Sequence, residues 1–159
     1  MGSRFRRFAA FTTALTFILI LLGVYTAAMG AGLSCSQQWP FCDGGLIPQT
    51  IPSFIEWFHR LVAMVTGFFI LGTTIGAWKY YDSTRIRAAA TLALVVLPVQ
   101  VLLGGATVLI YGPLVQTAHH AAAMVIFASL LATTLWAYEE PQQATAPATD
   151  SPGGYPSDD

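Results

Sequence analysis

Four long hydrophobic stretches, separated by shorter polar segments, dominate the pattern of this chain. They cover residues 8–29, 54–78, 88–110 and 114–138. A helix that crosses the hydrocarbon core of a bilayer needs about 20 mostly apolar residues, and each stretch reaches that length. The pattern therefore predicts an all-α membrane protein in which residues 1–140 form a bundle of four transmembrane helices. No self-similarity at a fixed period is visible in the sequence, so we expect one four-helix unit rather than a tandem array.

The segments outside these stretches differ in character. Residues 30–53 form the longest connection, whereas residues 141–159 are rich in Pro, Ala, Asp and Ser and contain no basic residue. Such a composition is typical of a disordered tail. The first stretch follows a cluster of arginines, as the core of a secretory signal does, but its apolar run exceeds the roughly 7–15 residues of a signal core. We therefore interpret it as a retained membrane anchor.

Composition and charge support a membrane location. Hydrophobic residues make up 55% of the 159 residues and charged residues only 9%, against roughly 25% charged residues in a soluble domain. Six of the seven basic residues fall into two clusters: Arg4, Arg6, Arg7, Lys79, Arg85 and Arg87. The positive-inside rule places both clusters and both termini in the cytoplasm, and residues 30–53 on the outer side of the cell membrane. Clusters of this kind orient a chain among membrane lipids, and we expect no nucleic-acid partner.

Two of the three histidines lie at equivalent places in different helices. His59 is about five residues into the second predicted helix, and His119 is about five residues into the fourth. Both helices run inward, so at about 1.5 Å per residue each imidazole lies roughly 7 to 8 Å below the outer border. Such a pair can supply both axial ligands of a haem iron. The alternative is two unrelated polar side chains hydrogen-bonded inside the bundle. His120 points about 100° away around the helix, and its role stays open.

A carboxylate and a guanidinium flank His59 on the second predicted helix. Glu56 precedes His59 by three positions, which puts both side chains on one face about one turn apart. A carboxylate at this depth is costly unless it has a partner or a task. Arg60 follows Glu56 by four positions, which allows an intrahelical ion pair. The alternative gives Arg60 to a haem propionate and leaves Glu56 near the porphyrin edge for proton transfer.

The third predicted helix carries two adjacent glycines at the depth of the histidines. Gly104 and Gly105 lie five or six residues from its outer end. Small residues allow a neighbouring helix or a flat ligand to approach closely, so the pair is consistent with a haem site and also with helix packing alone. Pro98 in the same stretch predicts a kink.

Both cysteines, Cys35 and Cys42, lie in the connection predicted to face the outside. Disulfides form and persist on that side of the membrane, so we expect an intramolecular bridge. Closing a ring of about eight residues contributes roughly 2.5 kcal/mol on the chain-entropy model, enough to hold the loop over the mouth of the bundle. The alternative role is redox exchange with a partner, although the spacing is neither CxxC nor CxxCH.

Taken together, these motifs resemble the haem A synthase family. The resemblance rests on the loop from Gly30 to Cys42, the run Glu56-Trp57-Phe58-His59-Arg60, the run from Gln100 to Val108, and His119. It covers nearly all of the four helices and the outer loop. The cysteine loop and the Glu-Trp-x-His-Arg run are specific in combination, whereas the Gly-Gly run alone is a weak signal.

The resemblance implies an activity and a role for several residues. Members of the family oxidise the C8 methyl of haem O to the formyl of haem A by successive hydroxylations, for terminal oxidase assembly. By resemblance, His59 and His119 are haem ligands, Glu56 is needed for activity, and Cys35 and Cys42 form a loop disulfide. The remaining members of the expected haem-binding set are Arg60, Gly104 and Gly105.

The length of the chain departs from the usual pattern of that family. Most members join two four-helix halves, with a substrate haem in the first half and a b-type haem in the second, and this chain resembles the first half only. We therefore expect a homodimer, whose second copy offers a further haem site. The reaction also needs an electron carrier. Nothing in the sequence resembles a flavin or nicotinamide site, so we expect a quinol or another membrane protein, with haem O synthase as a further partner.

Two other functions stay open on the sequence. A bis-histidine b-type cytochrome would carry electrons or deliver haem without modifying it. A four-helix thiol oxidoreductase would use Cys35 and Cys42 with a quinone. The equal depth of the histidines and the spacing of the cysteines argue against the thiol oxidoreductase.

Overall fold

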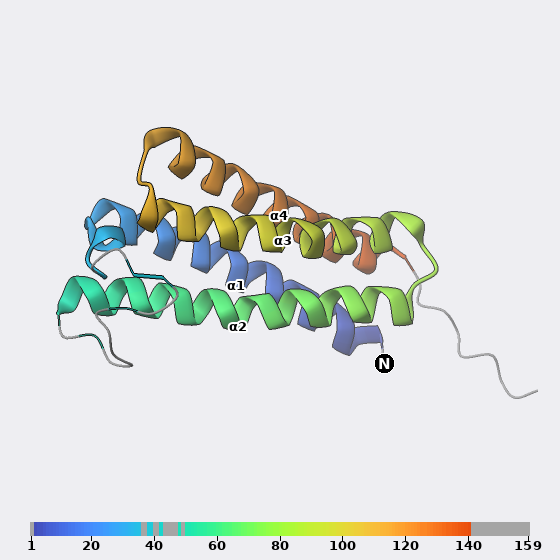
Figure 1. Ribbon diagram of the computed structural model, residues 1–159. Helices are drawn as coiled ribbons and strands as arrows, with labels where there is room; N and C mark the ends of the chain where they lie inside the picture. The colour runs from blue at the N-terminus through green and yellow to red at the C-terminus, as the bar shows by residue number, and fades with distance from the viewer. Residues whose placement is uncertain (1, 36–37, 40–41, 43–47, 49, 141–159) are drawn as a thin grey trace, which may run out of the picture.

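Four long helices make up most of the computed structural model, which describes residues 2–35, 38, 39, 42, 48 and 50–140. They are α1 (Gly2–Ala28), α2 (Ile51–Tyr80), α3 (Thr84–Leu109) and α4 (Pro113–Glu139), and a short 3-10 helix, η1 (Ala31–Leu33), follows α1 (Figure 1). All four long helices are long and apolar enough to cross a membrane. The predicted fold class, an all-α bundle of four transmembrane helices, is confirmed.

All four helices begin earlier than the hydrophobic stretches predicted. α2 begins at Ile51 rather than at residue 54, because the Thr50 side chain caps the helix by accepting a hydrogen bond from the Ser53 backbone N–H at 3.3 Å. A proline in the first turn suits this start, since its missing N–H has no partner there in any helix. α1 begins six residues before its apolar stretch, and its Phe5 side chain is buried against Tyr81. The predicted tail 141–159 and much of the connection 30–53 lie outside the described residues.

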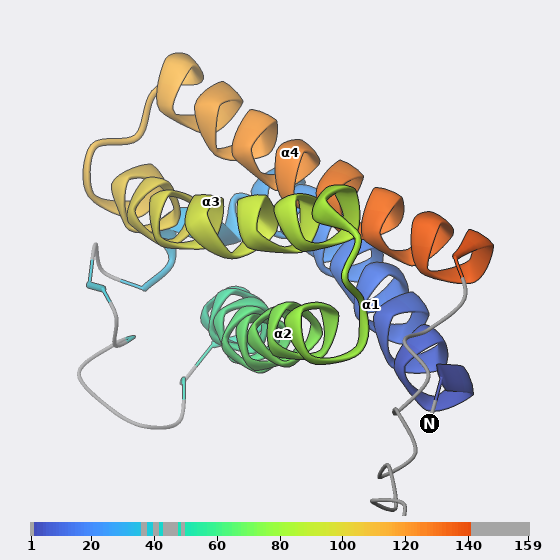
Figure 2. The ribbon, with the colours of Figure 1, turned by 90° about the vertical axis from the view of Figure 1, so that its right-hand side faces the viewer.

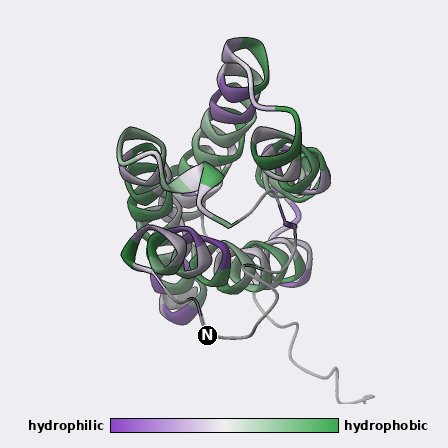
Figure 3. Cartoon of the chain, turned by 60° about the vertical axis from the view of Figure 1, so that its left-hand side comes forward, coloured by the Kyte–Doolittle hydropathy of each residue, from purple (hydrophilic) through white to green (hydrophobic). Residues whose placement is uncertain are grey.

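The four helices form a closed ring in chain order. α1 packs on α2, α2 on α3, α3 on α4, and α4 returns to α1 (Figures 1 and 2). α2 and α4 therefore occupy opposite corners, with α1 and α3 between them. Hydrophobic residues predominate in the helices (Figure 3), and large side chains such as Phe68 and Leu102 are exposed. A bilayer core is the solvent in which such faces are stable.

Buried hydroxyls join the helices in the half of the bundle near the chain termini. The Thr12 and Thr73 hydroxyls lie 3.0 Å apart between α1 and α2, and those of Thr13 and Thr134 lie 3.0 Å apart between α1 and α4. The hydroxyls of Thr12, Thr13 and Thr73 also have the carbonyl four residues earlier as an acceptor, so their hydrogen bonds are made without water. This half of the bundle is a packed core, which leaves the opposite half for the histidines.

A polar cluster closes the end where α1 starts and α4 stops. Glu140 accepts hydrogen bonds from Arg85 Nε at 2.6 Å and from the Ser83 hydroxyl at 3.0 Å through its carboxylate. Its backbone carbonyl accepts a further bond from Arg6 Nη2 at 3.0 Å. These contacts connect α1, the α2–α3 turn and α4. The basic clusters thus lie at one end of the bundle, and their cytoplasmic side stays a prediction.

Candidate functional site

His59 and His119 come from opposite corners of the ring and lie in its other half. His59 belongs to α2 and His119 to α4. Both imidazoles are half-buried. In the part of the chain that the structure describes, Nδ1 of each ring is buried and has no hydrogen-bond partner. Each of the two sequence-predicted histidines therefore keeps a buried ring nitrogen that protein groups leave free.

Gln100 of α3 is a polar neighbour of His119. Its Nε2 lies 3.3 Å from Nε2 of His119, while its Oε1 is buried and has no partner among the described residues. The contact is long for a hydrogen bond, and its direction depends on the imidazole tautomer. Gln100 thus holds the ring in place through a weak contact that a stronger ligand can replace.

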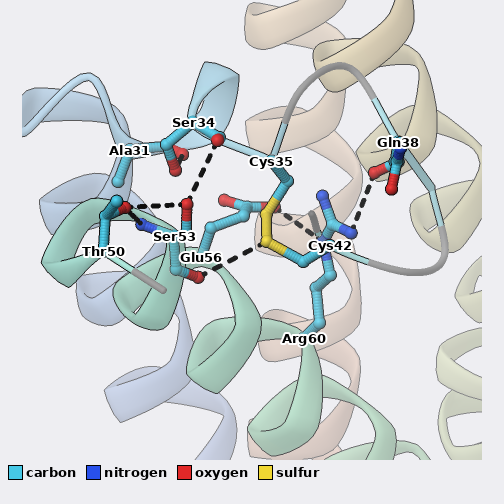
Figure 4. The surroundings of a disulfide bond; sticks show 9 residues. All are labelled: Ala31, Ser34, Cys35, Gln38, Cys42, Thr50, Ser53, Glu56 and Arg60. Atoms are coloured by element: carbon cyan, nitrogen blue, oxygen red, sulfur yellow. Dashed lines mark hydrogen bonds and ion pairs between the residues drawn. A yellow bond between two sulfur atoms is a disulfide. The ribbon is translucent and has the colours of Figure 1, made fainter. Parts of the chain in front are cut away.

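Glu56 and Arg60 form the ion pair that their spacing allows. Arg60 Nε donates to Glu56 Oε1 at 2.9 Å, and the Glu56 side chain is only 7% exposed. Arg60 Nη1 also donates to the backbone carbonyl of Gln38 at 3.1 Å (Figure 4). A buried carboxylate is tolerated here because the guanidinium compensates its charge. Arg60 in addition connects α2 to the outer loop.

A disulfide closes part of the outer loop beside the first turn of α2. Cys35 and Cys42 are joined by a disulfide, as predicted, and both are buried (Figure 4). Sγ of Cys42 lies 3.7 Å from the Ser53 carbonyl oxygen, and the Ser53 hydroxyl donates to the Ser34 carbonyl at 3.1 Å. These contacts tie the disulfide to the first turn of α2. Glu56 follows Ser53 by one turn of that helix, so the disulfide lies directly above the ion pair.

Trp39 is a site residue to which sequence reasoning assigned no role. A β-carbon added to Gly105 would lie 3.2 Å from Cδ2 and 3.3 Å from Cε2 of the Trp39 indole. The loop therefore reaches across to α3 and rests its ring on a glycine. The neighbouring Gly104 faces His119 instead. The signal in the sequence was an aromatic residue between the two cysteines of a loop predicted to cover the bundle.

His120 is held along its own helix. Its Nδ1 donates to the backbone carbonyl of Gln116 at 2.8 Å, and the Gln116 side chain lies within 3.3 Å of the same nitrogen. The ring meets that of His119 edge to face, with centroids 6.1 Å apart. His120 is thus a neighbour of the pair, and its Nδ1 is already occupied.

The donor set suits an iron porphyrin. A haem iron already has four ligands from its macrocycle and takes one or two axial ligands from the protein. His59 and His119 would hold it, because each keeps a buried nitrogen without a partner. Within the described residues, no group of three or more His, Cys, Asp or Glu side chains is arranged to hold a metal ion. Two imidazoles on opposite corners are the arrangement that a flat ligand between helices requires.

The fold and this site together define a multi-pass membrane protein with a paired-histidine site in a four-helix bundle. Comparison with known proteins gives the family. Residues 6–54 and 50–154 match the family model of a cytochrome oxidase assembly protein, COX15-CtaA. The chain belongs to this family, the haem A synthases.

The similar proteins are longer than this chain. The heme A synthase of Bacillus licheniformis is 36% identical over 132 residues, which cover 80% of this chain and 43% of that protein. The heme A synthase of Bacillus cereus is 32% identical over 149 residues, 90% of this chain and 48% of that protein. A protoheme IX farnesyltransferase of Halobacterium salinarum is 38% identical over 122 residues, 76% of this chain and 27% of that protein. The chain thus spans less than half the length of these curated relatives.

Proposed function

We propose that the chain oxidises the C8 methyl of haem O to the formyl of haem A, for terminal oxidase assembly. The observation that carries the proposal is the pair His59 and His119, each with a buried Nδ1 that lacks a partner among the described residues. Membership of the haem A synthase family supports the same conclusion. When bound, the haem supplies both the methyl group to be oxidised and an iron that changes oxidation state.

The protein's own contribution is to hold the porphyrin and to manage protons. Two hydroxylations of one methyl give a diol, which loses water to leave the formyl, and protons move at each step. Glu56 is a buried carboxylate one helical turn from His59, so it can accept or return a proton near the reacting edge. Arg60 Nε donates to that carboxylate at 2.9 Å and compensates its charge. Each hydroxylation takes one oxygen atom from dioxygen and reduces the other to water with two protons and two electrons. An electron carrier of the quinol class, or another membrane protein, supplies those electrons.

The outer loop excludes water from the site. The disulfide, the Arg60 contact to Gln38 and the packing of Trp39 on Gly105 hold the loop against α2 and α3. A site closed in this way strengthens the electrostatic interactions inside it and protects a reactive intermediate from side reactions. The location of this loop on the extracytoplasmic side of the membrane is part of the same proposal.

Haem O synthase is the proposed source of the substrate. The match to the protoheme IX farnesyltransferase covers only 27% of that protein. A segment similar to this chain therefore lies in one polypeptide with the rest of an enzyme named for farnesyl transfer. This arrangement supports direct delivery of a farnesylated haem within the membrane.

The homodimer is also a proposal. The heme A synthases that match are about twice as long, since the match covers 43% and 48% of them. A second copy would supply a further four-helix unit and a possible haem b site. Light scattering of the purified protein in detergent tests this, and a monodisperse, active monomer would contradict it.

The experiment that tests the activity is expression of the full chain in cells that make haem O but no haem A. We expect haem A in extracted haems by chromatography and in reduced pyridine spectra, and its loss in His59→Ala. Bound haem with no formyl product would instead support a bis-histidine cytochrome. A haem-independent activity that is lost in Cys35→Ser would support a thiol oxidoreductase.

A further inference from the structure

Each half of the ring presents a glycine to a histidine. In the α1–α2 pair, Gly23 lies five residues before Ala28, the last residue of α1, and contacts His59. In the α3–α4 pair, Gly104 lies five residues before Leu109, the last residue of α3, and contacts His119. The first helix of each pair therefore brings a glycine, at the same distance from its end, to the histidine of the second helix.

The two contacts also share their geometry. A β-carbon added to Gly23 would lie 3.0 Å from Cε1 of His59 and 3.7 Å from both of its ring nitrogens. A β-carbon added to Gly104 would lie 3.2 Å from Cε1 of His119, 3.7 Å from Nδ1 and 4.0 Å from Nε2. The same edge of each ring thus faces bare backbone. Both Cε1 distances are shorter than the roughly 3.5–4.0 Å of an ordinary carbon contact, so a methyl group fits only if the ring moves.

The similarity continues around each ring. Residues three before and one after each histidine bond to each other across one turn: Glu56 with Arg60, and Gln116 with His120. The pair beside His59 is charged, whereas the pair beside His119 is neutral in its usual state. The sequence alone shows no repeat of fixed period, but the structure contains the same glycine–histidine contact, with a bonded pair of side chains beside the histidine, twice.

A histidine that binds a metal is usually oriented by a hydrogen bond from its other nitrogen to a protein group. Among the described residues neither nitrogen of either ring has such a bond of ordinary length: Nδ1 of both rings has no partner, and Nε2 of His119 has only the 3.3 Å contact with Gln100. Something else must fix the direction in which each imidazole points, because both must aim at one iron. The contact with glycine backbone is the constraint common to both rings.

We infer that Gly23 and Gly104 are positioning residues, which set the orientation of the two imidazoles by steric contact with their Cε1 edges. The contact between each glycine and its imidazole is seen in the structure. Its effect on haem binding rests on the proposed function. A competing explanation is that the glycines only let the helices pack closely. Gly67 is the matched control, because it is also a half-buried glycine of a long helix, and an added β-carbon there would meet only Leu97 Cδ2 at 3.6 Å.

The first arm of the test needs no haem. The full chain contains three histidines, so selective ¹³Cε1-histidine labelling in detergent gives three NMR signals, each assigned by replacing its residue. We expect Gly23→Ala to shift the His59 signal and Gly104→Ala to shift the His119 signal, while Gly67→Ala moves neither. Unchanged signals in the first two variants would overturn the inference.

The second arm measures haem binding and the electron paramagnetic resonance spectrum. We expect Gly23→Ala and Gly104→Ala to weaken haem binding roughly tenfold or more and to change the g values, as loss of ligand orientation does. Gly67→Ala should behave as wild type. A wild-type protein that binds no haem defeats the proposed function, and the NMR arm still decides the positioning. If the wild type binds haem and the two glycine variants bind it with the same affinity and g values, the positioning role alone is wrong.

Misfolding of a glycine variant is itself informative. Should Gly23→Ala fail to fold, His59→Ala in the same chain removes the ring that the new methyl meets, and the double variant should recover its helical circular dichroism and thermal transition. Failure of that rescue would mean that Gly23 serves helix packing, and the inference would be wrong.

Discussion

Glu56 and Arg60 form an ion pair with 2.9 Å between Oε1 and Nε, and His59 lies between them on the same helix. Both side chains are largely buried, so the pair is a fixed part of the site. Removing one member of a buried pair leaves the other charge without compensation, which costs more than the pair contributes. The carboxylate and the guanidinium must therefore be tested by variants that keep shape and change charge.

Glu56→Gln should keep haem binding and lose the reaction. The amide retains the size of the carboxylate and can still accept from Arg60, but it cannot take up a proton. We expect the rate of haem A formation to fall about 100-fold, as for loss of a general acid–base group. Haem content and haem A content of the same preparation give the two readouts. Glu139→Gln, at the far end of α4, is the control; an active Glu56→Gln enzyme would remove this residue from proton transfer.

Gln100→Leu should strengthen haem binding. In the structure the Gln100 amide lies 3.3 Å from Nε2 of His119, so iron that binds through this nitrogen must displace it. A weak hydrogen bond contributes roughly 0.5–1.5 kcal/mol, which corresponds to an affinity gain of about two- to tenfold when the competitor is removed. Haem titration followed by absorbance measures it. Weaker binding in Gln100→Leu would mean that Gln100 supports the bound ligand rather than competing with it.

Gly105→Ala should lift the outer loop from α3. The added methyl would lie 3.2 Å from the Trp39 indole, a ring that is already 39% exposed. The indole must move away from α3 to admit the methyl, which increases its exposure to water. The fluorescence of Trp39, taken as the difference between chains with and without Trp39→Phe, should shift to longer wavelength. Gly67→Ala provides the comparison, and an identical Trp39 spectrum in Gly105→Ala would show that the contact does not hold the loop.

The Glu140 cluster should make thermal stability depend on pH. The Ser83 hydroxyl and the Arg85 guanidinium hold the pKa of the Glu140 carboxyl below its ordinary value. A carboxyl with a lowered folded-state pKa stabilises the fold fully above its unfolded pKa, and this stabilisation is lost as the pH falls through the folded pKa. Because the side chain is partly exposed and screened by solvent, the effect should be small. Wild type should lose slightly more thermal stability than Glu140→Gln between neutral and acidic pH; equal losses would contradict this.

The fold could be predicted from the sequence because hydrophobic length alone decides how a chain crosses a bilayer. Each predicted stretch lies within one of the four helices or ends one residue beyond it. The first residues of the helices could not be predicted from hydrophobic length. The early start of α2 depends on the Thr50 cap, and that of α1 on the burial of Phe5. Neither contact leaves a signal in a hydrophobic pattern.

The site was predictable only in part. The histidines, the ion pair and the disulfide follow from residue type and local spacing, since helical geometry brings positions four apart together. The contacts of Gly23 with His59 and of Trp39 with Gly105 join segments that are distant in the chain. No local pattern marks a lone glycine in an apolar helix as the partner of a particular side chain. Such contacts require the packed bundle.

The most direct measurement is the haem content and low-spin electron paramagnetic resonance signal of the purified full chain, compared with His59→Ala, His119→Ala and His120→Ala. Paired axial imidazoles predict bound haem with a bis-histidine signal in the wild type and in His120→Ala, and loss of that signal in each of the other two variants. A wild-type chain without haem, or a bis-histidine signal that survives replacement of both His59 and His119, would contradict the paired-histidine site.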